Sequence, residues 1–291
     1  MEFKEEFTMG SFSILNNIAG INSQNQLNIN NVNLHRTLSR LASGRRINSG
    51  ADDAAGLQIA DSLRANVMAL NQAVRNANDG ISVCQIADGA LQEITNLLTR
   101  NVTLAEESAT EIVDLAGRKA LNKEMDAIKK EITRIAEDTN FNGLKLFAGT
   151  DALADSKLSV FVGDLTNMSM VDVSFGSILS GGTGFDTDDL NAADLLDETN
   201  AQATLTVLKD ALNDIAIMRG NLGAGMNRLQ AAVAVIQAQS QNTLAAESAM
   251  RDANMAEEIS NLTKFQILSQ SGIAALAQAN SQSQSVLQLL Q

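Results

Sequence analysis

Apolar residues recur at every third or fourth position over most of this chain, and none of its 291 residues is a proline. The longest such stretch begins with Leu63, Val67, Leu70, Val74, Ala77, Ile81 and Cys84 and runs to Leu98. This spacing is that of a coiled-coil seam, which a proline would interrupt. It returns over residues 121–135, 205–236 and 255–290. We therefore predict a mainly α protein whose long helices form coiled-coil-like bundles.

The composition fits thin bundles better than a wide globular core. Trp and Tyr are absent and aromatic residues make up 3% of the chain, whereas hydrophobic residues make up an ordinary 45%. The net charge of -13 argues against nucleic acid or an anionic membrane as a partner, since both need a basic surface. No apolar run approaches the roughly 20 residues of a membrane span, so we expect no membrane insertion.

Residue types that carry catalysis or bind metals are scarce. His35 is the only histidine and Cys84 the only cysteine, which excludes a zinc-protease motif and an intrachain disulfide. Cys84 falls on the apolar seam, where a buried small hydrophobe is favoured over a redox thiol. A glycine cluster over residues 220–225 favours a kink or a close backbone approach over a phosphate loop. We expect neither an enzyme nor a cofactor.

Small and charged residues over positions 43–56 separate two helical patterns, which predicts a joint between helices. Four charged residues of this run, Arg45, Arg46, Asp52 and Asp53, lie close together in the sequence. We interpret them as joint and intersubunit contacts made by ion pairs within or between copies; a dedicated partner site is the alternative. Helix capping explains Asp52 and Asp53 better than acid–base catalysis does.

The two ends of the chain carry apolar seams that lack a partner other than each other. The front seam consists of Leu27, Leu34, Leu38 and Leu41, and the back seam includes Leu262, Phe265, Leu276, Val286 and Leu290. We predict that the N- and C-terminal helices pair. Because neither seam can bury itself alone, we also expect residues 11–45 and 255–291 to become ordered only on contact between copies.

One region alternates as β-strands do. Residues 158–162 and 170–175 predict two strands, and so one small β-hairpin region at about 150–185. The string Asn-Phe-Asn-Gly at 140–143 is interpreted as the end of the helix before it.

Six strings stand in a fixed order at the two ends of the chain, at residues 43–56, 75–82, 256–262, 266–268, 276–280 and 287–290. Together they resemble bacterial flagellin, the filament subunit of the flagellum, and the similarity covers roughly residues 9–175 and 205–291. The resemblance implies an inner coiled-coil domain of residues 10–49 and 251–291. It also implies a rod domain of three long helices and the hairpin over residues 50–250, without the outer variable domains of larger flagellins. Residues 1–8 do not fit this pattern and are interpreted as a translated leader or extension.

The resemblance implies a structural subunit that polymerises into the extracellular flagellar filament for motility. Its implied partners are further copies of itself, the flagellar export apparatus, an export chaperone on the C-terminal segment, and the filament cap and hook–filament junction proteins. Export without a cleaved signal peptide is expected, because the N-terminus lacks a basic region followed by an apolar core.

Arg100, Leu104 and Glu124 match the positions by which many flagellins are sensed by the vertebrate Toll-like receptor 5. They would supply a multidentate donor, an apolar anchor and a complementary charge, respectively. Val102 and Thr103 replace the charged pair usual in the family, which predicts weaker recognition. A purely structural helix face is the alternative.

Two other functions fit part of the sequence. A hook–filament junction protein would share related ends but would match less fully over residues 43–82 and 256–290. A soluble coiled-coil adaptor would form a discrete oligomer instead of long uniform tubes.

Overall fold

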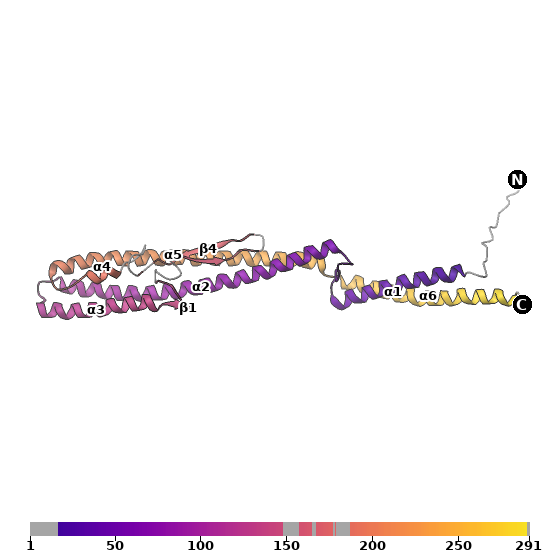
Figure 1. Cartoon of the computed structure of the whole chain (residues 1–291), viewed down its shortest axis with the longest axis horizontal. Helices are drawn as coiled ribbons and strands as arrows, with labels where there is room; N and C mark the ends of the chain where they lie inside the picture. The colour runs from indigo at the N-terminus through magenta and orange to yellow at the C-terminus, as the bar shows by residue number, and fades with distance from the viewer. Residues whose placement is uncertain (1–16, 148–156, 165–166, 177, 179–186, 290–291) are drawn as a thin grey trace, which may run out of the picture. The chain divides into compact units, whose positions relative to one another are not determined.

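The computed structural model describes residues 17–147, 157–164, 167–176, 178 and 187–289 (Figure 1). Residues 1–8, interpreted as a leader, lie outside these ranges. The chain divides into two compact units. We call residues 1–63 together with 245–291 the terminal unit, and residues 64–244 the middle unit. Long helices make up most of the described chain, which confirms the mainly α class.

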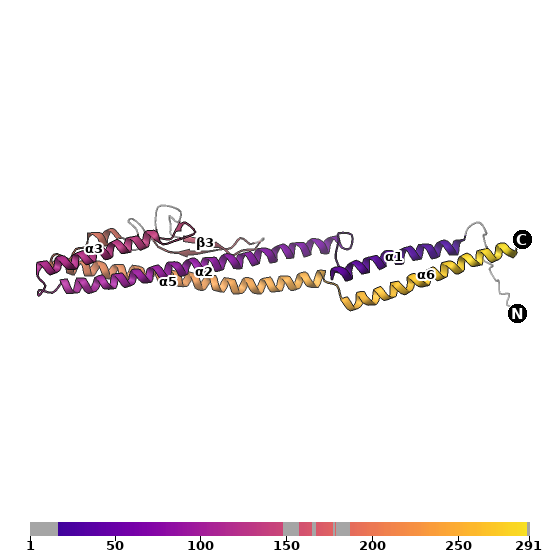
Figure 2. The same cartoon turned by 90° about the horizontal axis from the view of Figure 1, so that it is seen from below.

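In the terminal unit, helix α1 (Ile18–Ser43) runs antiparallel to helix α6 (Met255–Leu289), as two views at right angles show (Figures 1 and 2). At one end of this pair, the side-chain amide of Asn17 donates to the carbonyl of Ala279 over 3.2 Å. The predicted pairing of the N- and C-terminal helices is confirmed.

The middle unit contains most of α2 (Ala54–Ser108) and α5 (Glu198–Arg251), together with α3 (Leu115–Asp138) and the short α4 (Thr187–Ala192). Its core on α2 follows the predicted spacing closely, with Leu70, Ala73, Ala77, Cys84, Ala87, Leu91, Ile94 and Leu98 buried. Buried apolar residues of α3 and α5 complete the same core. The apolar stripes of the three helices therefore cover one another, as amphipathic helices require.

A β-hairpin packs onto these helices. Its strands β3 (Lys157–Phe161) and β4 (Met170–Ser174) are antiparallel and fully paired, within one residue of the predicted bounds. A Cβ atom added at Gly80 of α2 would lie 2.7 Å from Val160, and one added at Gly225 of α5 would lie 2.5 Å from Val173. Glycine is therefore needed for the close approach of the hairpin, while α5 stays one continuous helix across its glycine cluster.

A second antiparallel ladder follows α3, where the sequence pattern predicts only a helix end. Its strands are β1 (Asn140–Phe141) and β2 (Leu144–Lys145), two residues each. Asn142 and Gly143 between them have φ angles of 51° and 81°. These left-handed conformations are those of a tight two-residue hairpin turn, for which Asn-Gly is the strongest short sequence signal.

Candidate assembly interface

The joint between α1 and α2 is tied by its backbone to the end of α5. Gly44 ends α1 in the left-handed conformation, with a φ of 69°. Its carbonyl accepts the N–H of Ala253 over 3.0 Å, and the N–H of Arg46 donates to the carbonyl of Arg251 over 2.7 Å. Two segments about 200 positions apart in the sequence are thus held together inside the terminal unit.

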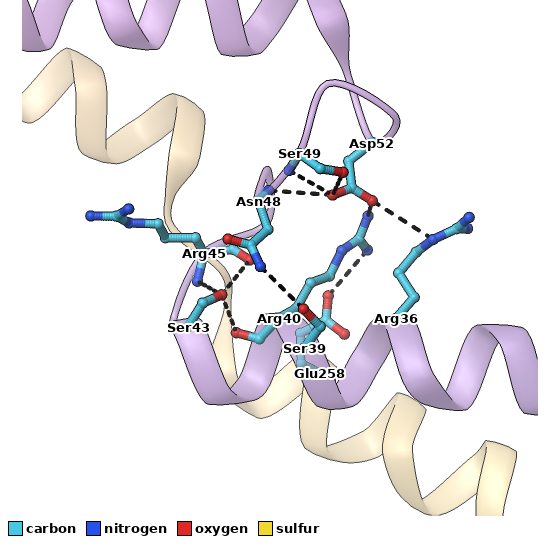
Figure 3. A network of polar contacts seen from close by, with 9 residues as sticks. All are labelled: Arg36, Ser39, Arg40, Ser43, Arg45, Asn48, Ser49, Asp52 and Glu258. Carbon is cyan, nitrogen blue, oxygen red and sulfur yellow. Dashed lines mark hydrogen bonds and ion pairs between the residues drawn. The ribbon is translucent and has the colours of Figure 1, made fainter.

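Asp52 organises the loop of the joint (Figure 3). Its Oδ2 accepts the N–H of Asn48 over 3.3 Å, and the N–H and hydroxyl of Ser49 over 3.1 and 3.2 Å. Its Oδ1 lies 3.7 Å from Arg36 Nε and 3.9 Å from Arg40 Nη2. Burial alone would raise the pKa of this carboxyl, but the hydrogen bonds from Ser49 and Asn48 and the charge of Arg40 together hold the pKa below its usual value.

Arg40 connects this loop to α6. Its Nη1 donates to Glu258 Oε1 over 3.4 Å, and Glu258 is 7% exposed. A second tie joins the loop to α1, where the side-chain amide of Asn48 donates to the hydroxyl of Ser39 over 3.1 Å. A buried carboxylate needs a charged partner, so Arg40 links α1, the loop at Asp52 and α6 in one network (Figure 3).

The four charged residues predicted at the joint have different surroundings. Asp52 lies in the network, whereas Asp53 Oδ1 accepts the N–H of Gly56 over 2.9 Å and so caps α2. Arg46 Nη2 donates to a backbone carbonyl of α5 over 2.9 Å, and the side chain of Arg45 points away from the network (Figure 3). Among the described residues, neither arginine forms an ion pair with the two aspartates.

Sequence reasoning missed Arg36, Arg40 and Glu258 as members of this network. A signal for the two arginines was available, because they lie one turn apart on the same face of a helix and repel unless an acid pairs with them. Glu258 could not be recognised from the sequence as a member of the network, since the helix dipole already explains an acidic residue in the first turn of a helix.

The predicted assembly seams lie largely where α1 and α6 face each other. Half-buried members are Leu27, Leu34, Leu41, Leu262, Phe265 and Leu276. Leu38 is 43% exposed. The side chain of Val286 and the whole of Leu290 lie outside the described part of the structure.

Many of the residues through which α1 and α6 contact each other are polar or have small side chains. The buried residues of α1 are Gly20, Asn30 and Thr37. The hydroxyl of Ser269 donates to Asn31 Oδ1 over 3.3 Å. Within the described length of both helices, no large apolar side chain is fully buried. The pair therefore gains less apolar burial than a helical hairpin with a closed core.

Four other large apolar side chains of α1 face away from α6. Ile18, Ile21, Ile29 and Val32 are 60%, 53%, 53% and 58% exposed, respectively. At about 100° per residue they fall within an arc of roughly 80°, on the side of α1 opposite its buried residues. We call these four residues the α1 stripe. Three isoleucines of α6, Ile259, Ile267 and Ile273, are exposed to a similar degree.

Charge is distributed very unevenly along the chain. Residues 17–34 and 265–291 contain no acidic or basic residue. Residues 64–244, in contrast, carry twenty-four acidic and fourteen basic side chains. An apolar surface without charge is suited to contact identical copies, because identical charged surfaces repel one another.

The residues that match the receptor patch lie in the middle unit. Arg100 Nε and Nη2 both donate to Glu124 Oε1, over 2.9 and 2.7 Å, and the two side chains are about half exposed. Leu104 is fully buried, so it packs in the core instead of presenting an apolar anchor.

Elsewhere among the described residues, no group of three His, Cys, Asp or Glu side chains could hold a metal ion. The described helices include none with the length and apolarity to cross a membrane.

Comparison with known proteins gives consistent matches over both ends of the chain. Residues 14–152 match the family model of the bacterial flagellin N-terminal helical region, and residues 205–290 match that of the C-terminal helical region. Flagellin of Halalkalibacterium halodurans is 37% identical over 277 residues, which are 95% of this chain and 99% of that protein. Flagellin of Bacillus subtilis is 36% identical over 308 residues, with the same coverage.

Two further matches extend the comparison. The flagellar filament 30.7 kDa core protein of Treponema maltophilum is 34% identical over 292 residues, covering 95% of this chain and 99% of that protein. A solved structure described as a flagellar hook-associated protein from Vibrio parahaemolyticus has a TM-score of 0.57 and 14% identity, and covers 69% of this chain and 100% of that chain. At that identity the structural likeness shows the fold alone.

Proposed function

This chain belongs to the bacterial flagellin family, and we propose that its α1 stripe contacts neighbouring copies during assembly. As a flagellin it is a structural subunit that polymerises into the flagellar filament, outside the cell. One observation carries the proposal for the stripe: four large apolar side chains are exposed on a helix face without charge.

Burial of the stripe would contribute substantially to assembly. Each Ile or Val side chain that leaves water contributes about 1.5–3 kcal/mol. A contact between two different surfaces of identical subunits, when it does not close a ring, produces a helical polymer. The stripe on α1 and the exposed isoleucines of α6 provide two such surfaces on one terminal unit.

We extend the proposal to the joint and to the domain division. Arg45, which forms no ion pair with a described residue, contacts an acidic group of a neighbouring copy, while Arg46, Asp52 and Asp53 hold the joint within one copy. In the assembled filament, residues 10–49 and 251–291 form the inner domain and residues 50–250 the rod. The compact units of the single chain divide nearby, at 63/64 and 244/245.

The weak burial within the terminal pair also suits export. Helices that leave no large apolar side chain fully buried along their described length unfold at a lower cost than a closed core does, which suits passage through a narrow export apparatus. We propose that an export chaperone covers the exposed isoleucines of α6 until assembly, and that export uses no cleaved signal peptide. The filament cap and the hook–filament junction proteins meet the same surfaces at the two ends of the polymer.

Replacing Ile21 and Ile29 with glutamine tests the stripe. We expect the critical concentration for polymerisation, measured by sedimentation after seeding, to rise about tenfold or more, because two apolar side chains no longer contribute burial. The control variant carries Ile112→Gln and Met168→Gln, at two exposed apolar positions of the middle unit, and is expected to assemble normally. Filaments of normal length from the stripe variant in negative-stain images would contradict the proposal.

A second proposed interaction is recognition by Toll-like receptor 5. The exposed pair Arg100 and Glu124 supports it, since a half-exposed guanidinium can exchange its partner for one on a receptor. In a reporter-cell assay, Arg100→Ala is expected to weaken the response, while Arg75→Ala, an exposed arginine on the same helix, leaves it unchanged. Absence of any response to the parent chain would end this proposal.

A further inference from the structure

Helix α3 lies at the outer margin of the middle unit (Figures 1 and 2). Its sequence carries a line of positive charge. Lys119, Lys123, Lys130 and Arg134 are all exposed and fall within an arc of roughly 60° at about 100° per residue. Arg134 pairs with neighbouring acids of its own helix. The three lysines form no ion pair with any residue that the structure describes. We call Lys119, Lys123 and Lys130 the lysine stripe.

This arrangement is unfavourable within a single copy. Like charges one turn apart, as at Lys119 and Lys123, destabilise a helix by a few tenths of a kcal/mol. The rest of the middle unit is strongly acidic, yet α3 has six basic and five acidic residues. Acidic side chains are therefore abundant nearby, but the lysine stripe is not paired with them. Its charge is available to a partner outside the chain.

We propose that the lysine stripe docks on the acidic surface of the middle unit of a second copy in the filament. This inference rests on the proposed function, since it requires copies to lie side by side. The lysine stripe spans twelve residues of helix, or about 16 Å, along which it can meet acidic side chains of another copy. Asp210 and Asp214 on α5, one turn apart and without an ion pair among the described residues, are two carboxylates of this acidic surface.

Charge complementarity favours a second copy over other partners. Middle units carrying ten more acidic than basic residues repel one another in a polymer, so a lateral contact needs a local basic surface. Polymerisation also places the acidic surface of a neighbour permanently at high local concentration. An external polyanion would have to overcome the long-range repulsion of the whole unit.

The test compares two triple variants with the same change in net charge. The first carries Lys119→Glu, Lys123→Glu and Lys130→Glu; the matched control carries Lys145→Glu, Lys157→Glu and Lys209→Glu, three exposed lysines outside the stripe. At low salt, we expect the critical concentration of the stripe variant to rise about tenfold or more and that of the control less than about threefold. Raising the ionic strength should shrink the difference, because salt screens exposed ion pairs.

Each of the other outcomes would contradict either the docking of the lysine stripe or the proposed function on which it rests. Equal effects of the two triple variants would attribute the change to net charge and overturn the docking surface. Normal assembly of the stripe variant, with loss of parent-like retention on a heparin column, would assign the stripe to an external polyanion. Failure of the parent chain to polymerise would contradict the proposed function, independently of the lysines. Thermal unfolding of each monomer confirms that the variants fold.

Discussion

The contribution of Asp52 to the stability of the joint loop should depend on pH. Its pKa in the folded protein is lowered, so its contribution to stability is present above its unfolded pKa of about 3.9 and is lost as the pH falls through the folded value. We expect Asp52→Asn to lower the stability of the terminal unit by about 1–3 kcal/mol at pH 7, and by progressively less below pH 4. Amide hydrogen exchange across residues 48–53 measures this loss.

Asp53 provides the matched control for that experiment. Asp53→Asn makes the same change in charge, but asparagine caps a helix about as well as aspartate, so the cost should be a few tenths of a kcal/mol. Equal effects at both positions would mean that the loop is held by net charge and not by the contacts of Asp52.

Cys84 offers a probe of how the middle unit opens. Its thiol is fully buried, and burial raises the pKa to about 11, so both access and thiolate formation are suppressed. We expect a thiol reagent at pH 8 to label the native protein about a thousandfold more slowly than a Cys84→Ala variant carrying Ser82→Cys, an exposed position one half-turn away. Comparable labelling rates would contradict the buried position of Cys84.

At the joint, sequence reasoning recovers local contacts and misses distant ones. Capping by Asp53 follows from residue type and position, because a cap bonds to the next turn of its own helix. The pairing of Arg40 with Glu258 joins residues 218 positions apart, and it depends on the register of α1 against α6. Arg45 and Arg46 stand near Asp52 in sequence, yet the turn at Gly44 and the pairing with α5 lead their backbone elsewhere.

Among the secondary-structure elements, the closest packing is that of the β3–β4 hairpin against glycines of α2 and α5. Gly225→Ala would bring a Cβ to 2.5 Å from Val173, a branched side chain with little freedom to move. We expect a net loss of about 1–2 kcal/mol, because overpacking outweighs the gain in helix propensity. Thermal unfolding of the middle unit should shift down by several degrees.

Gly220→Ala on the same helix is the control. Apart from the adjacent residues and the nearby backbone of its own helix, no heavy atom lies within 4 Å of the Cβ that it would add, and the position is exposed. Its only effect should be the better helix propensity of alanine, a gain of about 0.5–1 kcal/mol. If Gly225→Ala also stabilised the protein, the close packing of the hairpin described here would be wrong.

The long helices were predictable because burial repeats with the helical period. Leu70, Ala77 and Leu91 of α2 are buried where the spacing predicts them. The close approach at Gly80 was not predictable, since a glycine in a helix has the same local signal whether or not another element contacts it. The ladder at Asn142 and Gly143 carries a strong turn signal, but its strands are too short to show alternation.

At the scale of the whole molecule, the buried core and the acidic excess lie in the same unit. The middle unit has the buried core and most of the acidic excess, whereas the terminal helices have neither. A unit with its own core is stable alone, and a pair of helices without one depends on contacts from outside. This separation supports the proposal that copies associate through their terminal helices.

Hydrogen exchange in monomer and filament tests this separation. We expect amides of α1 and α6 to exchange rapidly in dilute monomer, because their pairing leaves no large apolar side chain fully buried along the described length, and to become protected in the filament. Amides of α2 around Leu91 should be protected in both states, since their core is internal to one copy. Strong protection of both terminal helices in the monomer would mean that the α1 stripe is dispensable for their folding, and that assembly orders nothing.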